Sequence, residues 1–279
     1  MSSTAATGGS QSDTQVRVWD IPTRIFHWLL VALIVLAWAS YEFSEALGDP
    51  GLVIHRYNGY AVLVLVIWRV LWGVVGPSTA RFATFVRSPG TVLSYAGTMV
   101  SGRDRPYLGH NPLGGYGVVL ILAVVAFQVI LGLLSEEHNM TTWGPLSHLP
   151  DEETKKAITE LHGEFFYFGV LTIAALHVLA VVYHMAIKRE PIVRAMITGD
   201  KPLTENTADP SMRADRGAIA TTVMSLFTLT IAAGLFYGAI TLLGGRVFYC
   251  ATRPPRRAVD ANALRPNSVT HRSAGFGCK

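Results

Sequence analysis

Five long apolar stretches, separated by polar segments, dominate the hydrophobic pattern of the chain. They lie at about residues 26–43, 55–75, 113–134, 162–187 and 217–243. Each is close to the roughly 20 residues that an α-helix needs to cross about 30 Å of hydrocarbon. The strands of a membrane β-barrel would alternate apolar and polar residues over ~10 positions, and these stretches do not. The pattern predicts an all-α integral membrane protein: a four-helix transmembrane bundle plus a fifth transmembrane helix.

The composition supports the membrane prediction. Charged residues make up 15% of the 279 residues, against roughly 25% in a typical soluble protein. The formal net charge of +4 reflects the orientation of the protein in the membrane, because Lys and Arg gather on the cytoplasmic side of membrane proteins. We therefore expect no nucleic-acid partner. Cys250 and Cys278 are the only cysteines, which excludes a disulfide framework, a zinc cluster and a Cys-x-x-Cys-His haem attachment site.

The polar segments divide the chain into five parts. Residues 1–15 are small and polar, and we expect a disordered cytoplasmic N-terminus without a cleavable signal peptide. Residues 16–201 hold the first four stretches, 202–216 form a linker, and 217–245 contain the fifth helix. Residues 246–279 contain Pro and Arg without periodicity and are predicted to be a disordered basic tail.

Lys and Arg near the helix ends predict a cytoplasmic N-terminus. In that orientation the first four helices leave three cytoplasmic segments with these basic residues: Arg17, Arg24, Arg81, Arg87, Arg103, Arg105, Lys188, Arg189, Arg194 and Lys201. The two opposite loops hold only Lys155 and Lys156. The fifth helix does not fit this distribution of positive charge, because the tail that follows it would lie outside the cytoplasm with seven Lys or Arg residues.

Four histidines lie at helix positions rather than in loops: His27, His55, His162 and His177. Ionisable groups inside a membrane are costly and therefore functional candidates. Fifteen residues separate His162 from His177, so they share a helix face but lie roughly 22 Å apart, too far for one metal ion with ~2 Å bonds to nitrogen. The expected depth of each histidine in the membrane pairs His55 with His162 on the outer side and His27 with His177 on the inner side.

Two facing pairs of imidazoles are what two b-type haems require, since each haem iron takes four porphyrin nitrogens and two axial ligands. Three other interpretations stay open. The histidines could be interfacial anchors or hydrogen-bonded core residues, the sites could hold zinc, or the chain could be a scaffold or channel without a cofactor. Zinc is disfavoured because no carboxylate or thiol falls at the same depths.

Several ordered motifs between residues 16 and 201 carry a resemblance to a known family. These motifs are VWDIPTRIFHW (18–28), HRYNGY (55–60), WRVLWG (68–73), GHNPLGG (109–115), LHGE (161–164), LHV (176–178) and RAMITG (194–199). In them the chain resembles the bacterial cytochrome b-561 family, which includes the b-type cytochrome subunit of nickel–iron hydrogenases. The resemblance implies a four-helix bundle with two non-covalent b haems. It implies His27 and His177 as the ligands of the inner haem iron, and His55 and His162 as those of the outer one.

Four further residues have both a functional and a structural interpretation. Arg69 is level with the inner haem, where it could pair with a haem propionate or extend to the lipid headgroups. Arg24 could likewise pair with a haem propionate or extend to the lipid headgroups, and a role as a positive charge on the cytoplasmic side is favoured. His110 lies in the Gly-rich turn that starts the third helix, where it could be a polar helix cap or a contact of a haem propionate or a quinone. His184 is interpreted as an interfacial residue, with a pairing to His27 as the alternative.

The sequence therefore predicts a di-haem b-type cytochrome of the bacterial cytoplasmic (inner) membrane. It would carry electrons between the quinone pool and a redox partner, either a periplasmic cytochrome or a hydrogenase-like complex, in contact with membrane lipid. The direction of electron flow is left open, because fold-level analogy does not decide it. Two other functions remain: a surface haem reductase or oxidase of a small substrate, and a cofactor-free scaffold or transporter subunit. A transporter should show an internal repeat or broken helices near the membrane midplane, and the sequence shows neither.

Overall fold

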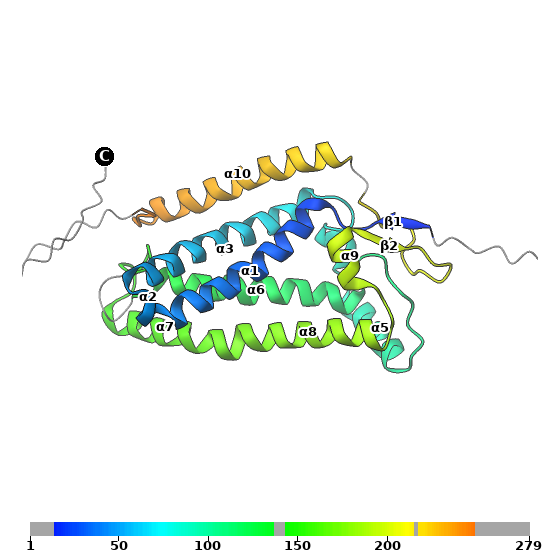
Figure 1. Cartoon of the computed structure of the whole chain (residues 1–279), viewed down its shortest axis with the longest axis horizontal. Coiled ribbons are helices and arrows are strands. Elements are labelled where there is room, and N and C mark those ends of the chain that lie inside the picture. Colours follow the sequence, from blue (N-terminus) through cyan, green and yellow to red (C-terminus); the bar gives the residue numbers. More distant parts are fainter. Residues whose placement is uncertain (1–13, 137–142, 215–216, 249–279) are drawn as a thin grey trace, which may run out of the picture.

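The computed structural model describes residues 14–136, 143–214 and 217–248, and five of its helices are long and apolar enough to cross a membrane (Figure 1). These are α1 (Ile21–Glu42), α3 (Asp49–Val75), α6 (Pro112–Leu134), the continuous helix formed by α7 (Glu152–Phe165), η1 (Phe166–Val170) and α8 (Leu171–Ala186), and α10 (Ala218–Leu242). The prediction of an all-α membrane fold with five spans is confirmed.

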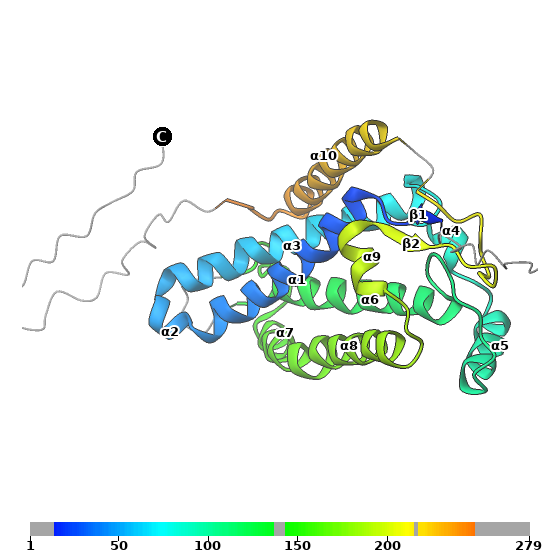
Figure 2. The same cartoon turned by 45° about the vertical axis from the view of Figure 1, so that its right-hand side comes forward.

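The first four spans form a bundle, and the fifth packs on its outside. α1 packs against α3, α3 against α6, and α6 against α7, η1 and α8. α10 lies along α3 and α1, on the side of the bundle away from α8 (Figures 1 and 2). The indole nitrogen of Trp68 on α3 donates a hydrogen bond to the carbonyl of Ser225 on α10, at 3.2 Å. The fifth helix is therefore part of the packed structure.

The bundle has two different ends, which we name after a short helix at each. The α2 end carries α2 (Ser44–Leu47) and the start of α7 (Figure 1). The α9 end carries the remaining short elements (Figures 1 and 2): β1 (Gln15–Arg17), α4 (Phe82–Phe85), α5 (Pro89–Val100), α9 (Ile192–Thr198) and β2 (Asp200–Pro202). β1 and β2 pair antiparallel, so the segments before and after the four-helix bundle meet at the α9 end.

Three of the helices begin earlier than the apolar stretches predict, because their first turns are polar. α1 begins at Ile21, where the side chain of Asp20 accepts a hydrogen bond from the Thr23 amide at 2.6 Å. α7 begins at Glu152, where Asp151 caps the Thr154 amide. Such side-chain caps satisfy the free amides of a first turn. α3 begins at Asp49 without a side-chain cap, and His27, His55 and His162 therefore lie inside helices rather than at their starts.

The fourth span contains one π-helical turn, η1, between His162 and His177. A π-bulge adds one residue to a turn, so the fifteen residues count as about fourteen α-helical steps, roughly 40° short of full turns. Without the bulge the two histidines would be offset by about 60° in the other direction. The two histidines lie on one side of the helix in either case, and the π turn changes only the direction and size of their offset.

Some residues of the predicted linker and tail belong to the packed part of the described structure. Met212, in the predicted linker, belongs to a small core with Val18 and Leu108. Val247, in the predicted tail, is buried beside Leu146 and Phe236. Gln15 begins β1, so the predicted disordered N-terminus does not extend to residue 15. Residues 1–13 and 249–279 lie outside the described residues.

Candidate functional site

The four helix histidines form two facing pairs. The ring centroids of His27 on α1 and His177 on α8 are 6.3 Å apart. Those of His55 on α3 and His162 on α7 are 6.1 Å apart. The first pair lies towards the α9 end and the second towards the α2 end. The structure thus brings together the residues that the sequence paired by depth.

The separation within each pair suits two axial ligands of one iron. Two imidazoles that bind a metal from opposite sides place their centroids about 6 Å apart, because each metal–nitrogen bond is ~2 Å and each ring adds about 1 Å. Each pair offers two ring nitrogens. Within the described residues no cluster of three or more His, Cys, Asp or Glu side chains could hold a metal ion. The donor set of each pair therefore fits a metal that brings its other ligands with it, as haem iron does.

Both rings of the His55–His162 pair are held by backbone carbonyls. Nδ1 of His55 donates to the carbonyl of Ala37 at 2.8 Å, and Nδ1 of His162 donates to the carbonyl of Gln128 at 3.0 Å. A hydrogen bond at Nδ1 fixes the tautomer and leaves Nε2 free to bind a metal. Both rings are thus set for ligation through Nε2.

α6 is shaped to receive the ring of His162. A Cβ on Gly132 would lie 2.9 Å from Cε1 of His162, closer than real side chains approach. The side-chain amide of Gln128, one turn earlier, donates to the carbonyl of His162 at 3.0 Å. A small residue and an amide on one helix face therefore fix the position of the His162 ring.

The His27–His177 pair has a different environment. Nδ1 of His27 is buried and has no hydrogen-bond partner among the described residues. On α3, at the same end of the bundle, the side chain of Arg69 is only 3% exposed, which excludes an extension to the lipid headgroups. Its guanidinium lies 5.1 Å from the ring centroid of Phe82, and its Nη1 has no hydrogen-bond partner within the described chain. A buried cation with a free N–H fits an anionic group such as a haem propionate.

His110 is not the helix cap that the sequence suggested, because Asn111 caps α6 by accepting from the Gly114 amide at 2.6 Å. The His110 ring packs between Trp19 and Phe85 with centroid distances of 4.8 and 4.6 Å. Burial, aided by nearby positive charge, lowers the pKa of His110 to about 3. It is therefore a neutral group, and its buried Nδ1 has no hydrogen-bond partner in the described segments.

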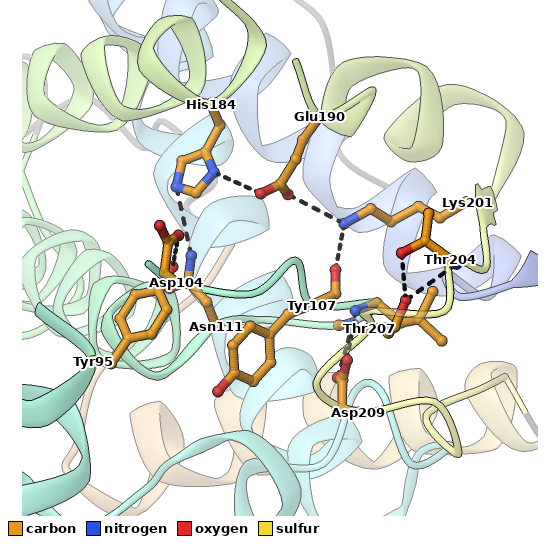
Figure 3. A network of polar contacts seen from close by, with 12 residues as sticks. Tyr95, Asp104, Tyr107, Asn111, His184, Glu190, Lys201, Thr204, Thr207 and Asp209 are labelled. Carbon is orange, nitrogen blue, oxygen red and sulfur yellow. Dashed lines mark hydrogen bonds and ion pairs between the residues drawn. The ribbon is translucent and has the colours of Figure 1, made fainter. Parts of the chain in front are cut away.

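Arg24 and His184 have structural partners. Nη1 of Arg24 donates to the carbonyl of Ile197 in the last turn of α9, which favours an anchoring role over a propionate contact. Nδ1 of His184 lies 3.3 Å from a carboxylate oxygen of Glu190, and its Nε2 lies 3.5 Å from the side-chain nitrogen of Asn111 (Figure 3). His177, not His184, therefore faces His27.

Comparison with known proteins assigns the family. A family profile described as prokaryotic cytochrome b561 matches residues 18–199. The chain belongs to the prokaryotic cytochrome b561 family. Membership implies a multi-pass membrane protein that binds haem b and transfers electrons. Neither the curated proteins nor the solved structures gave a match. The fifth helix lies outside the matched region.

Three residues around the histidines were not predicted from the sequence: Gln128, Gly132 and Glu190. Gln128 had a detectable signal, since it is the only amide or charged side chain in the apolar stretch 113–134. Gly132 lies four residues further along, on the same face of a helix. Glu190 had no signal, because its contacts depend on how the chain turns after α8.

Proposed function

We propose that this cytochrome b561 carries two b haems and passes electrons across the bacterial cytoplasmic membrane. His27 and His177 would ligate one haem iron, and His55 and His162 the other. Electrons would pass between the quinone pool and a redox partner protein at the opposite surface. Periplasmic cytochromes and hydrogenase-like complexes are both suitable partners.

One observation carries this proposal: two histidine pairs, with centroids 6.3 and 6.1 Å apart, near opposite ends of one bundle. Two ligand sites at different membrane depths support a relay through the bilayer. A haem iron held by two histidines would keep no open site for oxygen or a substrate, and the chemistry it would supply is electron transfer. This favours electron transfer over a surface haem reductase.

The residues of the chain would orient each cofactor. The carbonyls of Ala37 and Gln128 would keep Nε2 of His55 and His162 aimed at the metal. Arg69, buried and with a free N–H, would hold a propionate of the haem at the α9 end. Arg24 would position the start of α1 through the carbonyl of Ile197.

The distribution of charge supports an orientation. The α9 end carries β1, α9 and β2 together with most of the Lys and Arg residues that the sequence places on the cytoplasmic side. Positive charge near helix ends marks that side of the membrane. We therefore place the α9 end in the cytoplasm and the His55–His162 pair near the outer surface.

The function can be tested on the purified full-length protein in nanodiscs. A short-chain quinol such as duroquinol is mixed rapidly with the oxidised protein, and haem absorbance is followed. We expect reduction of both haems and no binding of carbon monoxide to the reduced protein. Failure of quinol to reduce haem that dithionite reduces would contradict a role in the quinone pool. Binding of carbon monoxide would contradict double histidine ligation and favour a surface reductase.

A further inference from the structure

An apolar cavity lies on the outside of the bundle, between α3, the α4 segment and α6. Its volume is about 640 Å³, within the range of roughly 300–1,000 Å³ that is usual for ligand pockets. Every residue that lines it is apolar. The lining residues Val70, Val86 and Val119 are 47%, 37% and 43% exposed. The cavity is therefore open to the surroundings of the helices, which in a membrane are lipid.

The cavity is separate from the two histidine sites. No described residue of α1, α7 or α8, the helices of His27, His162 and His177, lines it. Phe82 lines it, and the ring of Phe82 also lies against the guanidinium of Arg69, 5.1 Å from the ring centroid. α10 packs against α3 and α1 and does not line the cavity. Neither of the proposed haems nor the fifth helix therefore fills it.

The cavity covers the depth of one leaflet of a membrane. α6 begins at Pro112, at the α9 end, and the lining residues Val119 and Ala126 are seven and fourteen residues further along. At 1.5 Å per residue they lie roughly 10 and 21 Å from the start of α6. Half of the hydrocarbon core of a bilayer is about 15 Å thick. An acyl chain of the leaflet at the α9 end therefore lies at the depth of this cavity.

Tyr116 and Arg87 mark the level of the lipid headgroups at the end of the cavity. The hydroxyl of Tyr116, in the first turns of α6, donates to the carbonyl of Arg87 at 3.0 Å. Arg87 is exposed and directly follows Val86, which lines the cavity. Tyr and Arg are typical of the membrane interface, because their apolar parts lie in lipid while their polar ends reach the headgroups. A lipid whose chain fills the cavity therefore has its headgroup near Arg87.

The chain around α4 and α5 carries an excess of positive charge. Residues 77–111 contain one acidic residue, Asp104, and four basic ones: Arg81, Arg87, Arg103 and Arg105. The carboxylate of Asp104 forms an ion pair with Lys188, in the turn after α8, which neutralises it. The region therefore has a net positive charge, which favours an anionic headgroup over a zwitterionic one.

α5 adds an apolar surface beside these arginines. It packs against α6 and projects from the α9 end of the bundle (Figure 2). Leu93 and Val100, seven residues apart on one face of the helix, are 74% and 86% exposed. Arg87 precedes α5 and Arg103 follows it. An exposed apolar face with basic residues at both ends is typical of helices that lie in the surface of an anionic membrane.

We propose that this cavity, together with Arg87, is a binding site for an anionic phospholipid of the leaflet at the α9 end. One acyl chain occupies the cavity, and the phosphate pairs with the guanidinium of Arg87. The cavity is as apolar as the surrounding lipid, so it holds a chain by packing without choosing the lipid, and the arginines supply the selectivity. In the orientation proposed above this is the cytoplasmic leaflet. The site does not depend on the quinone reaction.

Native mass spectrometry of the purified full-length protein in detergent tests the site. Phosphatidylglycerol and phosphatidylcholine with the same acyl chains are titrated separately, so that only the headgroup differs. Glycerol phosphate, which has no acyl chain, is the third probe. Haem content and the melting temperature without added lipid are measured on every sample to establish that it is folded.

Two variants, each with a matched control, separate the headgroup from the chain. Arg87→Gln removes the proposed phosphate partner, and Arg194→Gln removes an exposed arginine on α9, at the same end of the bundle. Ala123→Phe places a ring in the cavity from α6, and Ala233→Phe adds one at an exposed position on α10. Ala83→Leu, which narrows the cavity from α4, replaces Ala123→Phe if that variant does not fold.

We expect wild-type protein to retain one phosphatidylglycerol per chain and to bind it about fivefold more tightly than phosphatidylcholine, the effect of one arginine near an anionic headgroup. Arg87→Gln should bind the two lipids equally. Ala123→Phe should lose both lipids, because the chain has no room. The two controls should match wild type, and glycerol phosphate should not bind.

Four results would overturn the proposal. Equal binding of the two lipids by wild type would show that the site does not select an anionic headgroup. An equal loss in Arg87→Gln and Arg194→Gln would assign the effect to the overall charge of the α9 end. Unchanged lipid binding in Ala123→Phe, or binding of glycerol phosphate as tight as that of phosphatidylglycerol, would exclude the cavity. A wild-type dimer that Ala123→Phe abolishes would show that a second copy of the chain covers it.

Discussion

The two histidine pairs have the same ring separation but are held in different ways. His55 and His162 each donate Nδ1 to a backbone carbonyl. Nδ1 of His27 has no partner among the described residues. The α9 end instead has the buried cation of Arg69 with a free N–H. One site is thus defined by the orientation of its ligands, and the other by the charge around it.

This difference predicts two haems of unequal reduction potential. A hydrogen bond from Nδ1 to a carbonyl makes the imidazole more basic and favours the oxidised iron. A buried positive charge favours the reduced iron, which carries one positive charge less. The haem at the α9 end should have the higher potential, and electrons would then run downhill from the α2 end to the α9 end.

The largest expected effect is the loss of one haem at a time. His162→Ala should reduce the haem content from two to one per chain and leave the high-potential component. His177→Ala should leave the low-potential component. Pyridine haemochrome content and a redox titration check both, and His148→Ala serves as the control. Loss of both haems from either variant would show that the pairs are not independent.

Gly132 gives a more selective way to disturb the α2 end. An alanine Cβ there would lie 2.9 Å from Cε1 of His162, so the ring must move away from its ligating position. Gly132→Ala should lower occupancy of the His55–His162 site several-fold and leave the other site filled. Gly117→Ala on the same helix, where a Cβ meets nothing within 4 Å, is the matched control. Equal haem content in the two variants would contradict the close fit.

Substitution of Arg69 tests whether a buried positive charge raises the reduction potential of the haem at the α9 end. Removing a buried charge about 10 Å from a haem at an effective dielectric constant near 20 is worth on the order of 2 kcal/mol, or tens of millivolts. Arg69→Gln should lower the potential of the His27–His177 haem by this amount and leave the other haem unchanged. Redox titration of both components measures the shift. An equal shift in both haems would rule out a local effect.

The smallest effect is expected for Gln128→Leu. The substitution removes the contacts of the side-chain nitrogen with the carbonyl of His162 at 3.0 Å and with its Nδ1 at 3.2 Å, but keeps the main-chain carbonyl that accepts from Nδ1. We expect both haems to remain and the low-potential component to shift by less than in Arg69→Gln. A redox titration with the Arg69 variant alongside decides this. Loss of the haem would mean that the side chain, not the carbonyl, holds the ring.

The spans and the pairing of histidines could be predicted from sequence because both follow from periodicity and length. An apolar stretch near 20 residues has few alternatives to a membrane helix. His162 and His177 were recognisable as belonging to two sites because fifteen residues, at about 1.5 Å each along a helix, place them too far apart to bind one metal ion. The helix starts were misplaced because capped first turns such as the one after Asp20 are polar, and hydropathy does not detect them.

Other features depend on contacts that no local pattern records. The π turn at Phe166–Val170 changes the phase between His162 and His177, and the apolar sequence there gives no sign of it. The guanidinium of Arg69 lies against the ring of Phe82, the first residue of α4, thirteen positions further along the chain. Glu190 meets His184 because of the way the chain turns after α8, and it meets Lys201 on β2, the strand that pairs with β1. Long-range packing decided these positions.

The most direct test of two haem sites in one bundle is the haem stoichiometry of purified full-length protein, with its low-temperature spectrum and redox titration. We predict two b haems per chain, both low-spin in both oxidation states, with two resolved potentials. A single haem, in protein fully loaded during expression, would show that one of the two histidine pairs does not bind iron and would contradict the account.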